Sequence, residues 1–161
     1  MSVQAGTWNY TEQPMDWKFL ANASSSLSGF GPDSEATYFD GPIGMLYRGS
    51  HTTTESRTER QPYITPGKNV ITWDGRLDNR EDLLHQLKDD LASDHTDVAL
   101  VAAAFDRWGT DCLAMFIGDW GLAIWDPQNK ELILARIIWE SGISSTILAW
   151  RGFSGVITSA H

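Results

Sequence analysis

The segment VALVAAAF, residues 98–105, restricts the possible folds of this chain more than any other stretch. It forms the centre of a predicted helix over 97–108, which Gly109 ends, and its apolar side chains surround the helix on nearly every side. A helix of this kind must be covered all round, so we expect it deep in a folded core. The chain has 161 residues, 42% of them hydrophobic and 20% charged, which is enough for one domain with such a core.

The remaining predicted elements are short strands and two further helices. The Asp40–Gly41 pair marks a hairpin, and Asp78 or Asn79 is expected to cap the second helix. The pattern predicts helices over 14–27 and from that cap to Leu91, an ordered loop over 51–61, strands over 3–8, 37–39, 43–47, 70–73, 117–125 and 131–135, and a final hairpin of 146–150 with 155–159. This order indicates a single α+β layered domain over residues 1–161.

The charge of the chain limits its partners. Acidic residues outnumber basic ones by 21 to 12, giving a formal net charge of −9 with no basic stripe, so we expect neither nucleic acid nor a membrane as partner. One cysteine excludes a disulfide framework and a multi-thiolate zinc site, and no cluster has metal-ligand spacing, so we expect no metal and no cofactor. No apolar run reaches the roughly 20 residues of a membrane span, and no signal peptide is evident, so we expect a cytoplasmic protein.

Eight tryptophans are unusually many for a chain of this length. Trp120 and Trp125 lie five residues apart, so a regular strand would point them to opposite faces. We therefore expect most tryptophans in the core or at an interface. A carbohydrate-binding β-domain is an alternative, and it requires a stack of tryptophans on one exposed face.

Several motifs follow one another through residues 1–136. The chain opens Met-Ser-Val-Gln-Ala-Gly, and further motifs are Phe-Gly-Pro-Asp-Ser-Glu at 30–35, the run from Gly41 to Arg48, Gln-Pro at 61–62, Asp-Gly-Arg-Leu-Asp-Asn at 74–79 and FIGDWGLAIWDPQNKELILAR at 116–136. In order and spacing they resemble the N-terminal glutamine amidotransferase domain of asparagine synthetases. The resemblance implies an α+β four-layer sandwich of the N-terminal-nucleophile hydrolase type, with two mainly antiparallel sheets between two helix layers.

The resemblance also assigns the catalytic positions. Ser2 stands where the family has its nucleophilic cysteine, and a hydroxyl is a much weaker nucleophile than a thiolate. Asp74 and Gly75 stand where the family has the Asn-Gly pair of the oxyanion hole. Gly75 keeps a backbone donor, but an ionised Asp74 only accepts hydrogen bonds and would repel an oxyanion.

The substrate-binding positions are altered as well. Arg76 stands where the family has a glutamate that binds the substrate ammonium group, so the charge at this position is reversed. A further acidic residue of the family aligns with Asp94 or His95. Gly49 stands where the family has an arginine that binds the substrate carboxylate. The neighbouring Arg48 is the nearest residue that could take over this role.

These changes predict a stand-alone amidotransferase-like domain that lacks glutaminase activity. An active amidohydrolase is the first alternative, with Ser2 as nucleophile, Gly75 as oxyanion donor and Arg76 binding a carboxylate-bearing amide. A non-catalytic interaction domain is the second.

Residues 137–161 depart from the family pattern. If one base is inserted into the gene after the Arg136 codon, the following codons can encode a peptide that contains the family motif. We therefore interpret residues 137–161 as the product of a shifted reading frame. The synthetase domain with its ATP motif is absent from the sequence. We expect the uncovered surface to be apolar and to support a homo-oligomer.

Overall fold

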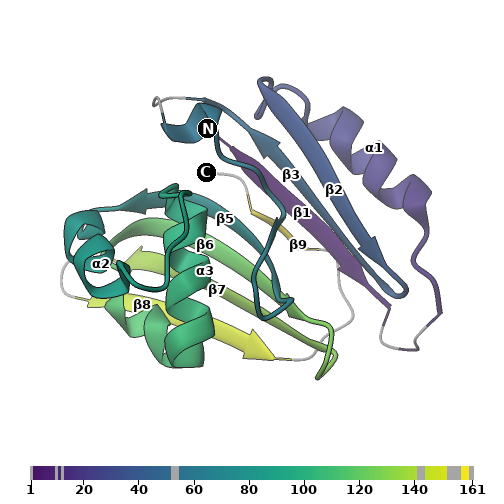
Figure 1. Cartoon of the computed structure of the whole chain (residues 1–161). Helices are drawn as coiled ribbons and strands as arrows, with labels where there is room; N and C mark the ends of the chain where they lie inside the picture. The colour runs from purple at the N-terminus through teal and green to yellow at the C-terminus, as the bar shows by residue number, and fades with distance from the viewer. Residues whose placement is uncertain are drawn as a thin grey trace. The chain divides into compact units, whose positions relative to one another are not determined.

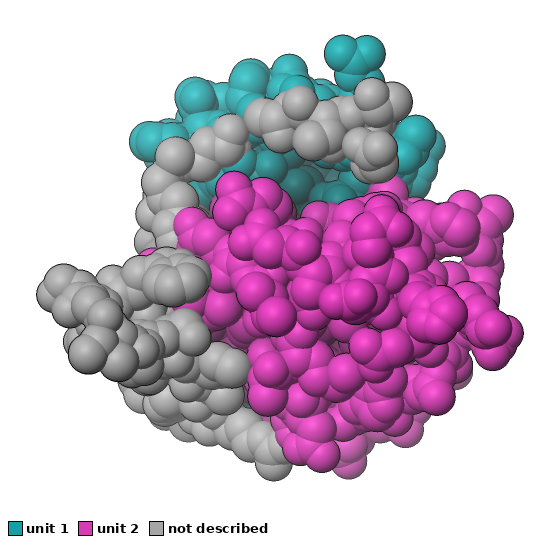
Figure 2. Space-filling model, turned by 90° about the vertical axis from the view of Figure 1, so that its left-hand side faces the viewer, with its two compact units in different colours: residues 1–62, 152–161 teal, residues 63–151 magenta. Residues whose placement is uncertain are grey.

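The computed structural model describes residues 2–9, 11, 13–51, 55–140, 144–151 and 157–159. The chain divides into two compact units (Figure 2), each described by itself below. Unit 1 comprises residues 1–62 and 152–161, and unit 2 comprises residues 63–151.

Unit 1 is built on a four-stranded antiparallel sheet (Figure 1). Its strands, in spatial order, are β2 (Ser34–Asp40), β3 (Ile43–Gly49), β1 (Val3–Trp8) and β9 (Ile157–Ser159). β2 and β3 form the predicted hairpin, with Asp40 paired to Ile43 and Gly41 at a φ of 54°, which favours glycine. Both strands are longer than predicted, because seven residues of each pair in continuous register.

One helix, α1 (Trp17–Leu27), runs along this sheet (Figure 1). It begins three residues later than predicted because Asp16 is its N-cap and accepts the Lys18 N–H at 3.0 Å. Leu20 of α1 packs with Ala5 and Leu46 of the sheet. The face of β1 and β3 that carries Ala5 and Leu46 therefore faces the helix. The following loop contains one turn of 3₁₀ helix, η1 (Glu55–Arg57).

Unit 2 is built on a five-stranded antiparallel sheet. Its strands, in spatial order, are β4 (Tyr63–Ile64), β5 (Val70–Leu77), β6 (Gly118–Asp126), β7 (Glu131–Glu140) and β8 (Ser144–Arg151). β5 continues four residues past its predicted end, since each of its residues pairs with β6. The motif at residues 74–76 is therefore part of a strand, whereas the sequence pattern placed it beyond the strand.

Two helices and a 3₁₀ segment cover one face of this sheet: α2 (Arg80–Leu87), α3 (Asp97–Trp108) and η2 (Gly109–Met115) (Figure 1). The prediction for the apolar helix is confirmed, because α3 buries six side chains at 2% exposure or less. It packs against α2, η2 and β5. The core cluster also takes in Trp73 and Trp120, whose rings stack with centroids 5.5 Å apart.

One local prediction is confirmed in position and another is wrong. Asn79 is the N-cap residue of α2, as expected, but its side chain makes no capping bond, because it accepts the Ile117 N–H and donates to the Met115 carbonyl. The final hairpin does not form, because β8 pairs with β7 in one sheet and β9 pairs with β1 in the other.

The predicted fold class is confirmed. The chain is α+β, with two antiparallel sheets, each carrying a helix layer. Within the described residues, no helix is both long and apolar enough to cross a membrane.

Candidate functional site

Ser2 lies at the start of β1, half-buried, with two partners for its hydroxyl. Its Oγ accepts the Ser50 N–H at 3.1 Å and lies 3.2 Å from the Tyr47 hydroxyl. The antiparallel register pairs Val3 with Arg48 and therefore brings the start of β1 to the end of β3. The side chain of Ser2 is thus fixed by residues some 45 positions along the chain.

A short chain of polar groups continues from Tyr47. The Tyr47 hydroxyl lies 3.5 Å from Glu59 Oε1, and the same oxygen accepts Gln61 Nε2–H at 2.5 Å. Tyr47 and Gln61 are buried and Glu59 is half-buried. The sequence motifs imply no role for these three residues. Side-chain alternation along a strand places Tyr47 on the same face as Gly49, so the sequence could have indicated it. Glu59 and Gln61 lie in a loop, where no periodic pattern predicts which way a side chain points.

The end of β3 has room for the Tyr47 ring because residue 49 is glycine. A Cβ at Gly49 would lie 3.1 Å from Cε1 of Tyr47 and would overlap Ser34 Oγ. Tyr47 and Gly49 share a face of the strand, and the intervening residue Arg48 points to the other. The Ser34 hydroxyl therefore takes the space that a side chain at position 49 would occupy, and the Tyr47 ring lies close beside it.

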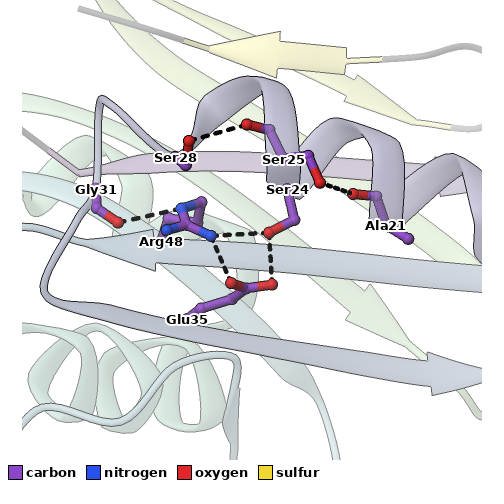
Figure 3. A network of polar contacts seen from close by, with 7 residues as sticks. All are labelled: Ala21, Ser24, Ser25, Ser28, Gly31, Glu35 and Arg48. Atoms are coloured by element: carbon purple, nitrogen blue, oxygen red, sulfur yellow. Dashed lines mark hydrogen bonds and ion pairs between the residues drawn. The ribbon is translucent and has the colours of Figure 1, made fainter.

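Arg48 faces α1, is buried, and joins a polar network that reaches the exposed Glu35 (Figure 3). Its guanidinium donates to Glu35 at 2.5 Å, to Ser24 Oγ at 2.8 Å and to the Gly31 carbonyl at 3.1 Å. Ser24 in turn donates to Glu35 at 2.5 Å. This network ties α1 to β2 and β3 and holds Arg48 on the face away from Ser2.

Three predicted residues are consecutive on β5 of unit 2. Asp74 is half-buried, whereas Gly75 and Arg76 are exposed. A Cβ at Gly75 would lie 2.5 Å from the Asp119 carbonyl and 2.6 Å from Cα of Trp120, so only glycine fits this crossing of β5 and β6. Arg76 binds Asp78 at 2.6 Å, and this hydrogen bond raises the pKa of the arginine.

Asp94 and His95 lie in the loop before α3. Asp94 accepts the Thr96 N–H at 2.9 Å, and the His95 carbonyl accepts from Arg80. Partial burial raises the pKa of Tyr63, and the negative charge of Asp94 raises it further. Asp94 and His95 therefore shape the entry into α3, and their place in substrate binding stays a prediction.

Other candidate sites lack the geometry they would need. In the described part of the chain, no three histidine, cysteine or acidic side chains gather as metal ligands. Among the tryptophans with described side chains, Trp17 alone is exposed, at 64%, so the stack that a carbohydrate platform requires is not formed there. Cys112 is fully buried in the core, and burial raises the pKa of its thiol to about 12.

Known proteins match most of the chain. The family described as "Glutamine amidotransferase domain" matches residues 1–138. The chain is 22% identical over 125 residues to asparagine synthetase (glutamine-hydrolyzing) 2 of Bacillus subtilis (strain 168), covering 77% of this chain and 17% of that protein. It is 26% identical over 133 residues to a putative asparagine synthetase (glutamine-hydrolyzing) of Mycobacterium tuberculosis (strain ATCC 25618 / H37Rv), covering 73% and 20%. It is 23% identical over 128 residues to asparagine synthetase (glutamine-hydrolyzing) 1 of Arabidopsis thaliana, covering 79% and 21%. The chain spans about a fifth of the length of these curated relatives.

Proposed function

Because this chain belongs to the glutamine amidotransferase domain family, we propose that it is an amidotransferase-like domain that no longer hydrolyses glutamine. Glutamine carries a carboxylate and an ammonium group besides the amide. Hydrolysis therefore needs partners for both charges as well as a nucleophile and an oxyanion hole.

The observation that carries the proposal is the arrangement at the end of β3. Gly49 has no side chain, Ser34 Oγ and the Tyr47 ring leave little room for one, and Arg48 is held by Glu35 on the opposite face. The Tyr47 hydroxyl on this face lies 3.5 Å from the Glu59 carboxylate. A substrate carboxylate beside Gly49 would therefore lie near a like charge and would have no side chain at position 49 to pair with.

Unit 2 gives independent support. Arg76 would repel an ammonium group, and its charge is already paired with Asp78. An ionised Asp74 supplies no donor for an oxyanion, and loss of one such donor typically lowers the rate by about 100- to 1,000-fold. These features also weigh against an amidohydrolase that uses Arg76 to bind a carboxylate.

The test is ammonia release from L-glutamine and L-asparagine. The sample is protein whose measured mass places Ser2 at the N-terminus, with Ser2→Ala as the matched control. We expect the two proteins to release ammonia at the same background rate. Release that exceeds the Ser2→Ala rate would contradict the proposal.

A gain-of-function variant sharpens this test. Ser2→Cys restores the stronger nucleophile but leaves Asp74, Arg76 and Gly49 unchanged. We expect Ser2→Cys to remain inactive on glutamine, because the altered binding residues also limit the reaction. If Ser2→Cys releases ammonia from glutamine, the missing thiol alone accounts for the lost activity. The arrangement at the end of β3 would then not explain it.

We further propose that residues 137–161 derive from a shifted reading frame. The family match ends at residue 138, close to the point where the motif is lost, which supports this origin. The nucleotide sequence of the gene tests this origin. If the codons after Arg136 cannot encode the family-like peptide once one base is inserted, a shifted reading frame is excluded.

A further inference from the structure

β2 is the outermost strand at one edge of the unit 1 sheet (Figure 1). The strand at the opposite edge, β9, has three residues, whereas β2 has seven, which pair with β3 in continuous register without a bulge. Edge strands usually avoid pairing with other chains by being short or bulged, or by carrying lysine or proline. The segment 34–40 has none of these protective features.

The hydrogen bonds of β3 show which backbone groups of β2 point outward. The Pro42 carbonyl, just before β3, accepts the Asn9 N–H from the β1 side at 2.8 Å. Since antiparallel hydrogen bonds alternate along a strand, the even-numbered residues of β3 bond to β1 and the odd-numbered ones bond to β2. The odd-numbered residues of β3 pair with the even-numbered residues of β2. Glu35, Thr37 and Phe39 therefore direct their N–H and C=O groups away from β3.

The side chains of β2 leave this edge open. Thr37 and Phe39 are exposed, and α1 packs on β1 and β3. The two carboxylates of β2 are Glu35, which binds Arg48 at 2.5 Å, and Asp40 at the end of the strand. The middle of the edge therefore carries no uncompensated charge, although the whole chain has a net charge of −9.

From this geometry we propose that β2 pairs antiparallel with β2 of a second copy of the chain, about a two-fold axis at Thr37. Thr37 is the central residue of the strand, so every residue of β2 finds a partner in this register. Glu35 lies opposite Phe39 of the second copy, and Asp40 lies opposite Ser34, so no like charges oppose each other. Each outward residue faces an outward residue of the other copy and exchanges both backbone hydrogen bonds with it.

The strand is thus complementary to itself, as a two-fold interface requires. The two sheets join into one continuous sheet, and the exposed backbone groups of both edges gain partners. This inference concerns the outer edge of β2 and does not depend on the proposed loss of glutamine hydrolysis.

Sedimentation equilibrium of the full chain measures the dimer, in about 0.15 M salt to screen the net charge beyond about 8 Å. Thr37→Asp and Thr37→Asn are the matched variants, since their side chains have nearly the same size and differ in charge. In a Thr37→Asp dimer two carboxylates face each other on the axis. We expect the unaltered protein and Thr37→Asn to dimerise, and Thr37→Asp to have a dissociation constant at least about tenfold higher than Thr37→Asn.

Cross-linking tests the register. On the axis the Cα atoms of residue 37 in the two copies would lie about 5.5 Å apart, within the range of a disulfide. Residue 36 of one copy is a diagonal neighbour of residue 36 of the other, about 7–8 Å away and beyond that range. We expect mild oxidation to convert Thr37→Cys into a covalent dimer at least about tenfold faster than Ala36→Cys. The unaltered protein gives the background, because its Cys112 is buried.

Three results would overturn the proposal. The first is an unaltered protein that sediments as a monomer at every concentration. The second is equal dimerisation of Thr37→Asp and Thr37→Asn. The third is a dimer in which Thr37→Cys cross-links no faster than Ala36→Cys, because the copies would then meet in another register or on another surface. If Thr37→Asp has a lower urea midpoint than Thr37→Asn, the cross-linking rates decide. Ammonia release from glutamine is a separate measurement, so the proposed function stands or falls independently of this dimer.

Discussion

Tyr47 and Arg48 are neighbours in sequence but serve opposite faces of β3. Tyr47 reaches Ser2, whereas Arg48 binds Glu35 and Ser24 beneath α1. Period-two alternation along a strand predicts this separation, so Arg48 does not point to the face that a side chain at position 49 would serve. The link from Tyr47 to Glu59 depends on a loop conformation that no local pattern in the sequence encodes.

Cys112 gives a prediction at the same scale. Its thiol is fully buried, and burial raises the pKa from an ordinary value of 9.0 to about 12, with the charge of Asp111 contributing further. Because the thiolate is the reactive form, we expect no reaction with a disulfide reagent at pH 8 in the folded protein and complete reaction in denaturant. Rapid labelling of the folded protein would contradict the burial of this side chain.

The pH dependence of stability provides a second readout for Cys112. Above pH 9 the unfolded thiol loses its proton while the folded thiol keeps it up to about pH 12, so the folded state binds more protons in this window. The free energy of unfolding should therefore fall as the pH rises, by about 1 kcal/mol per pH unit more than in Cys112→Ala. Equal slopes for the two proteins would show that Cys112 titrates alike in both states.

At the scale of elements, the end of α3 and both ends of β1 were predictable. Gly109 ends α3 as expected, and β1 has its predicted bounds. Strand lengths were less predictable, because β5 and β7 continue wherever a partner strand offers hydrogen bonds. The predicted tail hairpin is absent for the same reason: β8 pairs with the preceding strand β7, and β9 pairs with β1 at the other end of the chain.

The close approach of β5 and β6 can be tested at Gly75. Its substitution by alanine would force Cβ to within 2.6 Å of the Trp120 backbone, so the two strands would have to separate. We expect Gly75→Ala to lower the free energy of unfolding in urea by about 2 kcal/mol or more. Gly29→Ala is the matched control, since a Cβ there meets nothing within 4 Å, and it should leave the midpoint nearly unchanged. A stable Gly75→Ala protein would show that this glycine is not required by packing.

At the scale of the whole molecule, the family and fold class were predictable, because several motifs keep their order along the chain. The assignment of Ser2 and of Asp74 to Arg76 as site residues comes from those motifs alone and stays a prediction. The strongly acidic charge of −9 limits association with other anionic molecules. Trp17, Phe30 and Phe39 are exposed apolar side chains of unit 1 and are the first candidates for the expected self-association.

The last strand tests whether the divergent tail contributes to the fold. β9 pairs with Gln4, Ala5 and Gly6 of β1, the strand that begins beside Ser2. Ending the chain at Arg151 retains β8 but leaves β1 as an edge strand with unpaired backbone groups. Because each net hydrogen bond contributes about 1 kcal/mol, we expect the free energy of unfolding to fall by about 1–3 kcal/mol and self-association to increase. Removal of residues 160–161 alone is the control. Identical urea midpoints and sedimentation for both truncations would show that residues 152–161 add no stability, even though β9 extends the sheet.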